Sequence, residues 1–490
     1  MMGMQMFRKI GDEVILVYNP RTEEVEVGEN IKILDESRKR GLVVQVIEQS
    51  LVDLSGILED IIRIESMGEV EVEEYVPPEY ERYRLDVRNM KFARAKVRKE
   101  IRLEKSGEFI VDWTGWIPDR SAEVESIDDE WLMNKLGIDP DNFKHRIEVG
   151  KTAFSNKPFI ISGYHLQGIT IIVGKKGTGK SHVAKTLLLG LIDNGAHGVV
   201  FDINDEYSAL RFDSEGGKSP YYEKIISLDP GVNLRFTLDY LGPDVFFDVI
   251  QTAMGLSEPS AYELRNLWRE LERTNQLSFR NLRMAAEASL NKRILGAITR
   301  RLDRMEQTGL FTDDESKAIR LEDEFKKIEG GGALVVNLKM KDKVTIDLVV
   351  QTFLSKIQKL LEEGFPPLFI FAEEAHFYLR ETDWIEAVTR MRHLGSYQIY
   401  MTNTPTEIRP LVIRQVDNLF LFHLTETNDI QHISPAAKID PETVEQVAKS
   451  LPPRTYMMVG EATKHYPFIL KTKPLPVKTA GETRLFFKEP

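Results

Sequence analysis

The feature that most constrains the fold is a strand–loop–helix–strand pattern between residues 169 and 203. The apolar run ITIIVG leads into the loop KKGTGKS, then into the helical pattern HVAKTLLLGLIDNG and a second apolar run, GVVFDI. This order is typical of a βαβ unit, whose two strands run parallel. The pattern therefore predicts an α/β protein built on a parallel sheet.

The same rhythm continues after a long helical interruption. GGALVVNL, LFIFA, YQIYMTN and NLFLFHL predict further strands, and helical periodicity covers 345–363 and 383–394. Residues 245–330 are mostly helical by periodicity, as in AYELRNLWRELERTN. We therefore expect one core over 151–465, interrupted at about 245–330 by an inserted helical subdomain.

The N-terminal part has a different pattern. EVILVY, EVEV, NIKIL and GLVVQVIEQSL predict short strands within residues 13–51, and NMKFARAKVRKEIRLEK alternates apolar residues with basic residues at 94, 96, 98 and 102. Short strands at close spacing favour a small β-barrel, which we place over 1–115. Residues 116–150 are acidic and predict a linker with a short helix, and 466–490 form a tail too short to fold alone.

Bulk composition limits the class of protein. The 490 residues are 42% hydrophobic and 29% charged, with no cysteine, which is ordinary for a globular protein and excludes disulfides and thiolate metal sites. No apolar run approaches the roughly 18 residues of a membrane span, and the N-terminus lacks a secretory signal pattern, so we expect a cytoplasmic protein. The net charge of −12 argues against a protein that coats nucleic acid over its whole surface, but is compatible with a local basic channel.

The loop at 174–181 carries the clearest chemistry. It fits G-x-x-x-x-G-K-[ST] and lies between a strand and a helix, as a phosphate-binding loop requires. Its backbone N–H groups and the helix N-terminus would face the phosphates, Lys180 would reach the β- and γ-phosphates, and the Ser181 hydroxyl would bind Mg²⁺. The expected nucleotide-binding residues are Gly174, Lys175, Lys176, Gly177, Thr178, Gly179, Lys180, Ser181 and His182.

Two adjacent glutamates end the strand LFIFA. A P-loop protein needs an acid on a neighbouring strand, and successive side chains of a strand point to opposite faces. We therefore expect Glu373 to orient Mg²⁺ through its water shell and Glu374 to polarise the attacking water. A solvated acidic turn is the alternative.

Polar residues follow the next strand and the next helix. Thr402 or Asn403 would lie between the phosphate loop and Glu374, or would simply form a strand-end turn. In DWIEAVTRMRHLG, Arg390 and Arg392 flank an apolar stripe on opposite sides. One of them would face this subunit's nucleotide and the other a neighbour's, or both would be solvated.

These residues resemble the HerA/FtsK superfamily of ring-shaped DNA motors, and the HerA branch most of all. VVFDINDEYS, IFAEEAH and RMRHLGSYQIYMTNTP carry the resemblance beside the phosphate loop. It implies a RecA-like core, ATP and Mg²⁺ as cofactors, a homo-hexamer translocating double-stranded DNA, and a nuclease partner of the NurA type in DNA end processing. It also implies that Glu374 is the catalytic acid, that Arg392 acts in trans, and that Asn403 stands where a glutamine is usual.

The sequence does not decide which residues contact DNA. LKMKDK (Lys339 to Lys343), RILGAITRRLDR and the basic strand at 94–102 are candidates, and a solvated charged face is the alternative for each. No pattern predicts base reading, so binding should be independent of DNA sequence. A conjugation- or packaging-type motor and a nucleotide-dependent scaffold that recruits an effector remain alternative functions.

Overall fold

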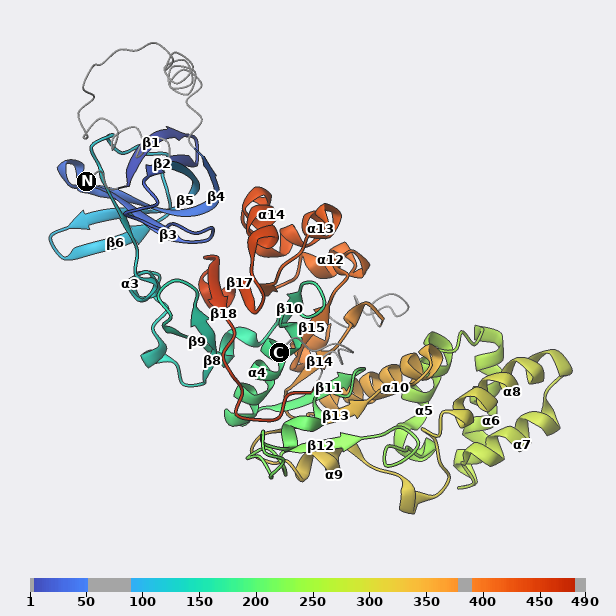
Figure 1. The fold of residues 1–490 in the computed structure, drawn as a ribbon. Coiled ribbons are helices and arrows are strands. Elements are labelled where there is room, and N and C mark those ends of the chain that lie inside the picture. Colours follow the sequence, from blue (N-terminus) through green and yellow to red (C-terminus); the bar gives the residue numbers. More distant parts are fainter. Residues whose placement is uncertain (1–3, 52–89, 378–389, 481–490) are drawn as a thin grey trace, which may run out of the picture.

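The computed structural model describes residues 4–51, 90–377 and 390–480 (Figure 1). An N-terminal antiparallel sheet, a large mixed sheet and a group of helices follow one another along an elongated molecule (Figure 1). None of the helices in these ranges has the length and apolar character needed to cross a bilayer.

The large sheet contains eleven strands among the described residues, in the order β12-β13-β11-β14-β15-β10-β16-β17-β18-β8-β9. Its parallel part is formed by β10 (Ile169–Val173), β11 (His197–Asp202), β12 (Ile225–Leu228), β13 (Gly332–Asn337), β14 (Leu368–Ala372), β15 (Ser396–Thr402) and β16 (Asn418–Leu421). Its antiparallel part is formed by β17 (Thr455–Gly460), β18 (Phe468–Lys471), β8 (Arg146–Thr152) and β9 (Pro158–Ser162).

Helices cover both faces of the parallel strands, which explains why these strands are continuous apolar runs. On one face, Ile172 of β10 packs in the same buried cluster as Leu187 of α4 (Lys180–Asp193). On the other face, Ile171 of β10 belongs to the cluster that contains Phe353 of α10 (Lys343–Glu362). Every residue of β10 and β14 is buried as a result.

Most remaining helices lie between β12 and β13. They are α5 (Leu238–Thr252), α6 (Glu258–Arg273), α7 (Phe279–Ser289), α8 (Lys292–Gln307) and α9 (Leu321–Lys326). Trp268 packs α6 against α5, since its ring lies 5.0 Å from Phe246 and 5.8 Å from Phe247. The short α12 (Pro410–Ile413) precedes β16, and α13 (Thr427–Ala437) and α14 (Pro441–Ser450) follow it.

The N-terminal sheet runs β1-β2-β5-β4-β3-β7, with β6 paired to β5. The strands are β1 (Gln5–Ile10), β2 (Glu13–Tyr18), β3 (Asn30–Asp35), β4 (Arg40–Leu51), β5 (Lys91–Glu104), β6 (Gly107–Val111) and β7 (Glu123–Ser126). The strand predicted at EVEV, residues 24–27, does not form. Among the described residues the strand path does not close, so the barrel stays a prediction.

The segments expected to be a linker and a tail contribute to both sheets. Within 116–150, β7 pairs with β3, α3 (Asp129–Lys135) follows, and β8 begins at Arg146. Within the tail, β18 pairs with β17 and β8. These pairings extend the large sheet beyond the boundaries expected at 151 and 465. Their register supplies the backbone hydrogen bonds that a short tail alone lacks.

Candidate nucleotide-binding site

The phosphate loop follows the last residue of β10 and leads directly into α4. Gly174, Gly177 and Gly179 all have positive φ, of 154°, 81° and 119°. A Cβ at Gly174 would lie only 2.4 Å from the Cβ of Phe422, so a larger residue would displace the β16 end that backs the loop. Glycine is therefore required there by conformation and by contact.

Lys180 is folded back over this loop. Its Nζ donates to the carbonyl oxygens of Gly174 at 2.8 Å and Lys175 at 2.9 Å. Burial lowers the pKa of Lys180, and the nearby Glu374 and Glu373 carboxylates partly offset that effect. The ammonium group is thus held where phosphate oxygens would compete with the two carbonyls.

Glu374 and Asn403 meet beside the loop. The strand order β14-β15-β10 places Asn403, which follows β15, between Glu374 and the phosphate loop. Asn403 Nδ2 donates to Glu374 Oε1 at 3.2 Å, and His376 Nδ1 lies 3.5 Å from Glu374 Oε2. Asn403 therefore lies where the sequence placed it, in contact with the expected catalytic acid.

Glu373 faces the opposite way, toward the loop that follows β11. Its Oε2 accepts the backbone N–H groups of Ile203 at 3.1 Å and Asn204 at 3.2 Å. The side chain is buried, and burial together with the neighbouring Asp202 raises the pKa of Glu373 to about 8. Glu373 therefore contacts the loop after β11, whereas Glu374 contacts Asn403 after β15. The two side chains point in opposite directions, as the alternation of side chains predicts.

An ionic pair between α4 and the loop after β11 was missed by sequence reasoning. Lys185 Nζ donates to Glu206 Oε2 at 2.7 Å and to the Ala480 carbonyl at 2.9 Å. The loop is shaped by Asp202, which accepts the backbone N–H groups of Glu206 and Tyr207 at 3.0 and 2.9 Å. The signal was present in FDINDEYS, where an acid ends a buried strand four residues before a second acid.

The residues present fit ATP and Mg²⁺. Glu373 Oε1 and Glu374 Oε2 are buried without a hydrogen-bond partner among the described residues, and both belong to carboxylates that Mg²⁺ or its water shell would satisfy. No group of three or more acids or histidines forms a metal cage in the described ranges. In P-loop sites Mg²⁺ is held by one or two protein groups together with the phosphates. Ser181 and Glu373 are the side chains that would take part, and the metal would offset the phosphate charge.

Arg392 lies away from its own phosphate loop. Its guanidinium contacts both carboxylate oxygens of Asp417, at 3.3 and 3.2 Å. Asp417 Oδ2 also accepts the N–H of Ile169, the first residue of β10, whereas the phosphate loop follows the last. Arg392 therefore lies near the N-terminal end of β10. That end is about 13 Å, along the strand, from the C-terminal end at which the phosphate loop begins. Arg390 is exposed on the same helical turn, and residues 378–389, which complete the expected stripe, lie outside the described residues.

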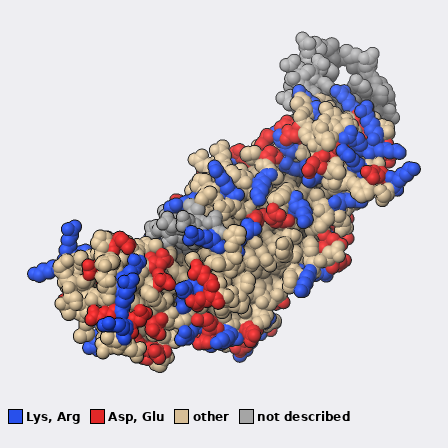
Figure 2. Space-filling model, turned by 180° about the vertical axis from the view of Figure 1, so that it is seen from behind, with Lys and Arg blue, Asp and Glu red and all other residues tan. Residues whose placement is uncertain are grey.

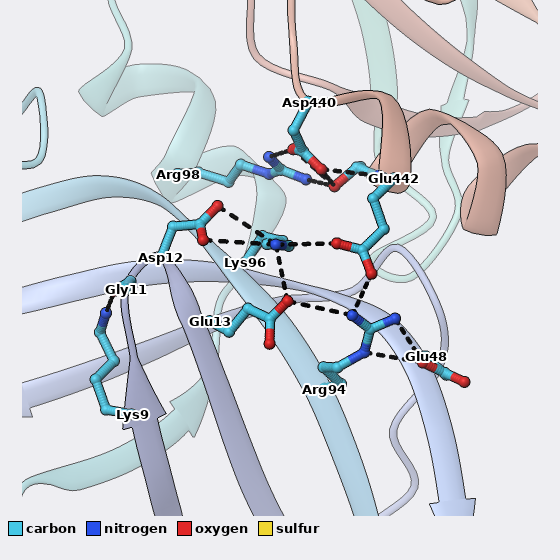
Figure 3. Close-up of polar contacts among 11 residues, drawn as sticks. Lys9, Gly11, Asp12, Glu13, Glu48, Arg94, Lys96, Arg98, Asp440 and Glu442 are labelled. Carbon is cyan, nitrogen blue, oxygen red and sulfur yellow. Dashed lines mark hydrogen bonds and ion pairs between the residues drawn. The ribbon is translucent and has the colours of Figure 1, made fainter. Parts of the chain in front are cut away.

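The basic strand at 94–102 contacts this chain rather than facing outward to DNA or a partner. Lys96 lies 2.9 Å from Glu13 and 3.0 Å from Glu442 of α14, and Arg98 lies 2.7 Å from Asp440 (Figure 3). Arg94 also contacts Glu442 in the same network (Figure 3). These residues attach the N-terminal sheet to the core because matched carboxylates lie opposite them on α14.

The fold and the site together define a P-loop ATPase core: a parallel sheet with the phosphate loop after the central strand β10 and two acids after β14, with β15 between these strands. The family model described as "Helicase HerA, central domain" matches residues 164–357. This part of the chain is therefore similar to the HerA-type P-loop ATPases.

The solved structures that match this chain are distant from it in sequence. VirB4 of Thermoanaerobacter pseudethanolicus is 15% identical, with 68% of this chain and 98% of VirB4 covered and a TM-score of 0.51. The plasmid coupling protein TrwB is 14% identical over 73% of this chain and 95% of TrwB, with a TM-score of 0.49. The genome packaging NTPase B204 of Sulfolobus turreted icosahedral virus 2 is 15% identical over 63% of this chain and 99% of B204, with a TM-score of 0.33. No curated protein sequence matches the chain.

Proposed function

We propose that this chain is an ATP-hydrolysing motor that translocates along double-stranded DNA as a homo-hexameric ring. The contact between Glu374 and Asn403 beside the phosphate loop is the observation that carries the proposal. In the proposal Glu374 polarises the attacking water and Asn403 senses the γ-phosphate, so the phosphate state would be coupled to the positions of the ends of β14 and β15. A cytoplasmic role in DNA end processing, with a NurA-type nuclease, follows from the HerA resemblance.

The position of Arg392 supports a role in trans. Arg392 lies at the end of β10 opposite the phosphate loop, too far to contact the nucleotide of its own subunit. An arginine finger instead acts on the site of a neighbouring subunit. Mixing Arg392→Ala subunits with wild-type subunits tests this role. Loss of activity in simple proportion to the mutant fraction would count against it, because a shared site makes each variant subunit affect its neighbour.

The loop between β13 and α10 is the proposed DNA contact. Met340 is 95% exposed, and the neighbouring Lys339 and Lys341 contact Asp205 and the Pro230 carbonyl at 3.3 and 3.2 Å. The face drawn in Figure 2 intersperses Lys and Arg with Asp and Glu. DNA contact is therefore expected at a local loop inside the ring, where a few cations meet phosphates without reading bases.

The test measures ATPase rate and assembly mass, each with and without blunt duplex DNA. The proposal expects a hexamer whose ATPase rate rises with duplex DNA. A monomer whose ATPase rate is unchanged by DNA would contradict it.

A nucleotide-dependent scaffold is the second candidate function. The observation that favours it is the use of Arg94, Lys96 and Arg98 within the chain, which removes one basic surface from the DNA-contact candidates. A scaffold would bind ATP and recruit an effector without stimulation by duplex DNA, so the same ATPase measurement separates the two functions. Co-fractionation with membranes would instead favour a conjugation- or packaging-type motor.

A further inference from the structure

A cavity of about 640 Å³ lies beside the N-terminus of α4, and we call it the tail cavity. Its walls are His182 on α4, the turn 452–454 with Thr455 at the start of β17, and the segment 471–479 that begins at the end of β18. The volume is within the roughly 300–1,000 Å³ of ordinary ligand pockets. The C-terminal segment therefore forms one wall of a space next to the nucleotide site.

The tail cavity is joined directly to the phosphate loop. Arg454 donates its backbone N–H to the Thr178 carbonyl at 3.0 Å and accepts the N–H of Thr472 at 2.9 Å. His182, the residue after Ser181, contacts the Lys473 carbonyl through Nε2. The turn, the loop and the tail are thus tied by backbone groups, and the cavity continues the site beyond Ser181.

One cation in the tail cavity is unengaged. Lys471 Nζ donates to the Ala153 carbonyl at 2.8 Å, and Lys473 Nζ lies 3.3 Å from Glu148. The described residues give the exposed Arg454 guanidinium neither a hydrogen-bond acceptor nor a carboxylate. Arg454 also has φ of 63°, so the turn holds this side chain in a backbone conformation that favours glycine.

The lining suits a flat heterocycle better than a further phosphate. Pro452, Pro453 and Leu475 supply apolar surface, and the two lysines already have partners. Because the carbonyl of Lys473 can only accept, His182 donates from Nε2, which leaves Nδ1 of the neutral ring as an acceptor. The planar guanidinium of Arg454 can stack on one face of a base, and the prolines can pack against the remaining surface of that base.

We propose that the tail cavity is the base and ribose subsite of the nucleotide site, with Arg454 stacking on a purine. The proposal rests on the proposed function, because it requires the triphosphate to occupy the phosphate loop. It assigns to the C-terminal segment a role in nucleotide affinity that the phosphate loop alone does not supply.

The test compares two ligands that share a phosphate chain and differ in the base. Binding of ATP and of inorganic tripolyphosphate, each with Mg²⁺, is measured by titration calorimetry on the full chain. Arg454→Ala should weaken ATP binding about tenfold and leave tripolyphosphate binding within about twofold. Lys464→Ala is the matched control, since Lys464 is an exposed cation with φ of 53° after the other end of β17.

Each other outcome overturns the subsite. Equal weakening of both ligands would make Arg454 a phosphate ligand, and no weakening of either would make it irrelevant to binding. Wild-type protein that binds tripolyphosphate as tightly as ATP would show that no base subsite exists. The proposed function is tested separately. If the chain binds ATP with the expected base dependence but its ATPase rate does not rise with duplex DNA, the subsite is supported and the motor function is contradicted.

Discussion

Asn403 donates a hydrogen bond to Glu374 across 3.2 Å, although the two residues are 29 positions apart and follow different strands. The contact joins the ends of β14 and β15, and β15 is the strand that separates β14 from the phosphate-loop strand β10. Movement of the Asn403 amide toward a phosphate would therefore release one carboxylate oxygen of Glu374. In the proposed function the pair would link the acid to the occupancy of the loop.

Glu374→Gln should retain ATP binding and lose turnover by about 10²–10⁴-fold, because a carboxamide cannot accept the proton of the attacking water. The measurement is kcat from a steady-state ATPase assay beside ATP affinity from calorimetry. Glu363→Gln, at the exposed end of α10, is the control and should leave both unchanged. Normal hydrolysis by Glu374→Gln would show that the two adjacent glutamates have been assigned the wrong roles.

Asn403→Ala should lower kcat by about tenfold with little change in KM, since its amide positions the acid rather than holding the substrate. In the Glu374→Gln background the same substitution should have almost no further effect, because residues that act as a unit are not additive. A double-mutant cycle in kcat measures this coupling. Additive losses would indicate that Asn403 acts on its own.

The sequence predicted the centre of the site because local patterns determine it. β10, the phosphate loop and α4 are consecutive, and the apolar runs LFIFA and YQIYMTN end at Glu373 and Asn403. The partners that complete the site come from distant parts of the chain. Arg454 contacts the phosphate loop and Ala480 contacts α4 because β17 and β18 add to the sheet, and short antiparallel strands after a helical stretch leave a weak periodic signal.

The basic strand β5 also has partners that the sequence pattern could not predict. Alternation predicted correctly that residues 94, 96 and 98 share a face, but it contained no information about what that face contacts. The carboxylates of α14 that meet it are more than 300 residues later in the chain. The charge pattern therefore predicted the basic face of β5 but not the carboxylates of α14 that contact it.

Lys185→Met should destabilise the nucleotide-free protein by about 3 kcal/mol, because it leaves the buried Glu206 carboxylate without its cation. Adding Glu206→Gln should restore much of the loss, since a neutral amide costs less to bury. Urea unfolding followed by tryptophan fluorescence measures both. Lys449→Met removes the exposed pair with Glu445 and should cost under about 0.5 kcal/mol. A similar small cost for Lys185→Met would contradict the assigned importance of the buried pair.

Glu442→Gln should weaken the attachment of the N-terminal sheet to α14 by about 1 kcal/mol at pH 7, as one charged acceptor is lost from Arg94 and from the nearly buried Lys96. Hydrogen bonds from Arg94 and Lys96 hold the pKa of Glu442 below its ordinary value. Burial raises the pKa of Asp440, but Arg98 and the hydrogen bonds from Thr443 together lower it below its ordinary value. A carboxylate with a depressed folded pKa stabilises the fold above its unfolded pKa of about 4.3, and that stabilisation disappears as the pH falls further. Wild type and variant should therefore differ in unfolding free energy at pH 7 and converge below about pH 4.

Glu445→Gln is the matched control for this network, because Glu445 lies on the same helix and pairs only with the exposed Lys449 among the described residues. Its effect should be smaller at pH 7 and should depend more strongly on salt, since exposed pairs are screened within about 10 Å at 0.1 M ionic strength. Hydrogen exchange of β5 amides should rise in Glu442→Gln and not in Glu445→Gln, because only Glu442 contacts that strand. Equal exchange in the two variants, or a difference in stability that persists below pH 4, would show that the carboxylates of α14 do not hold the sheet in place.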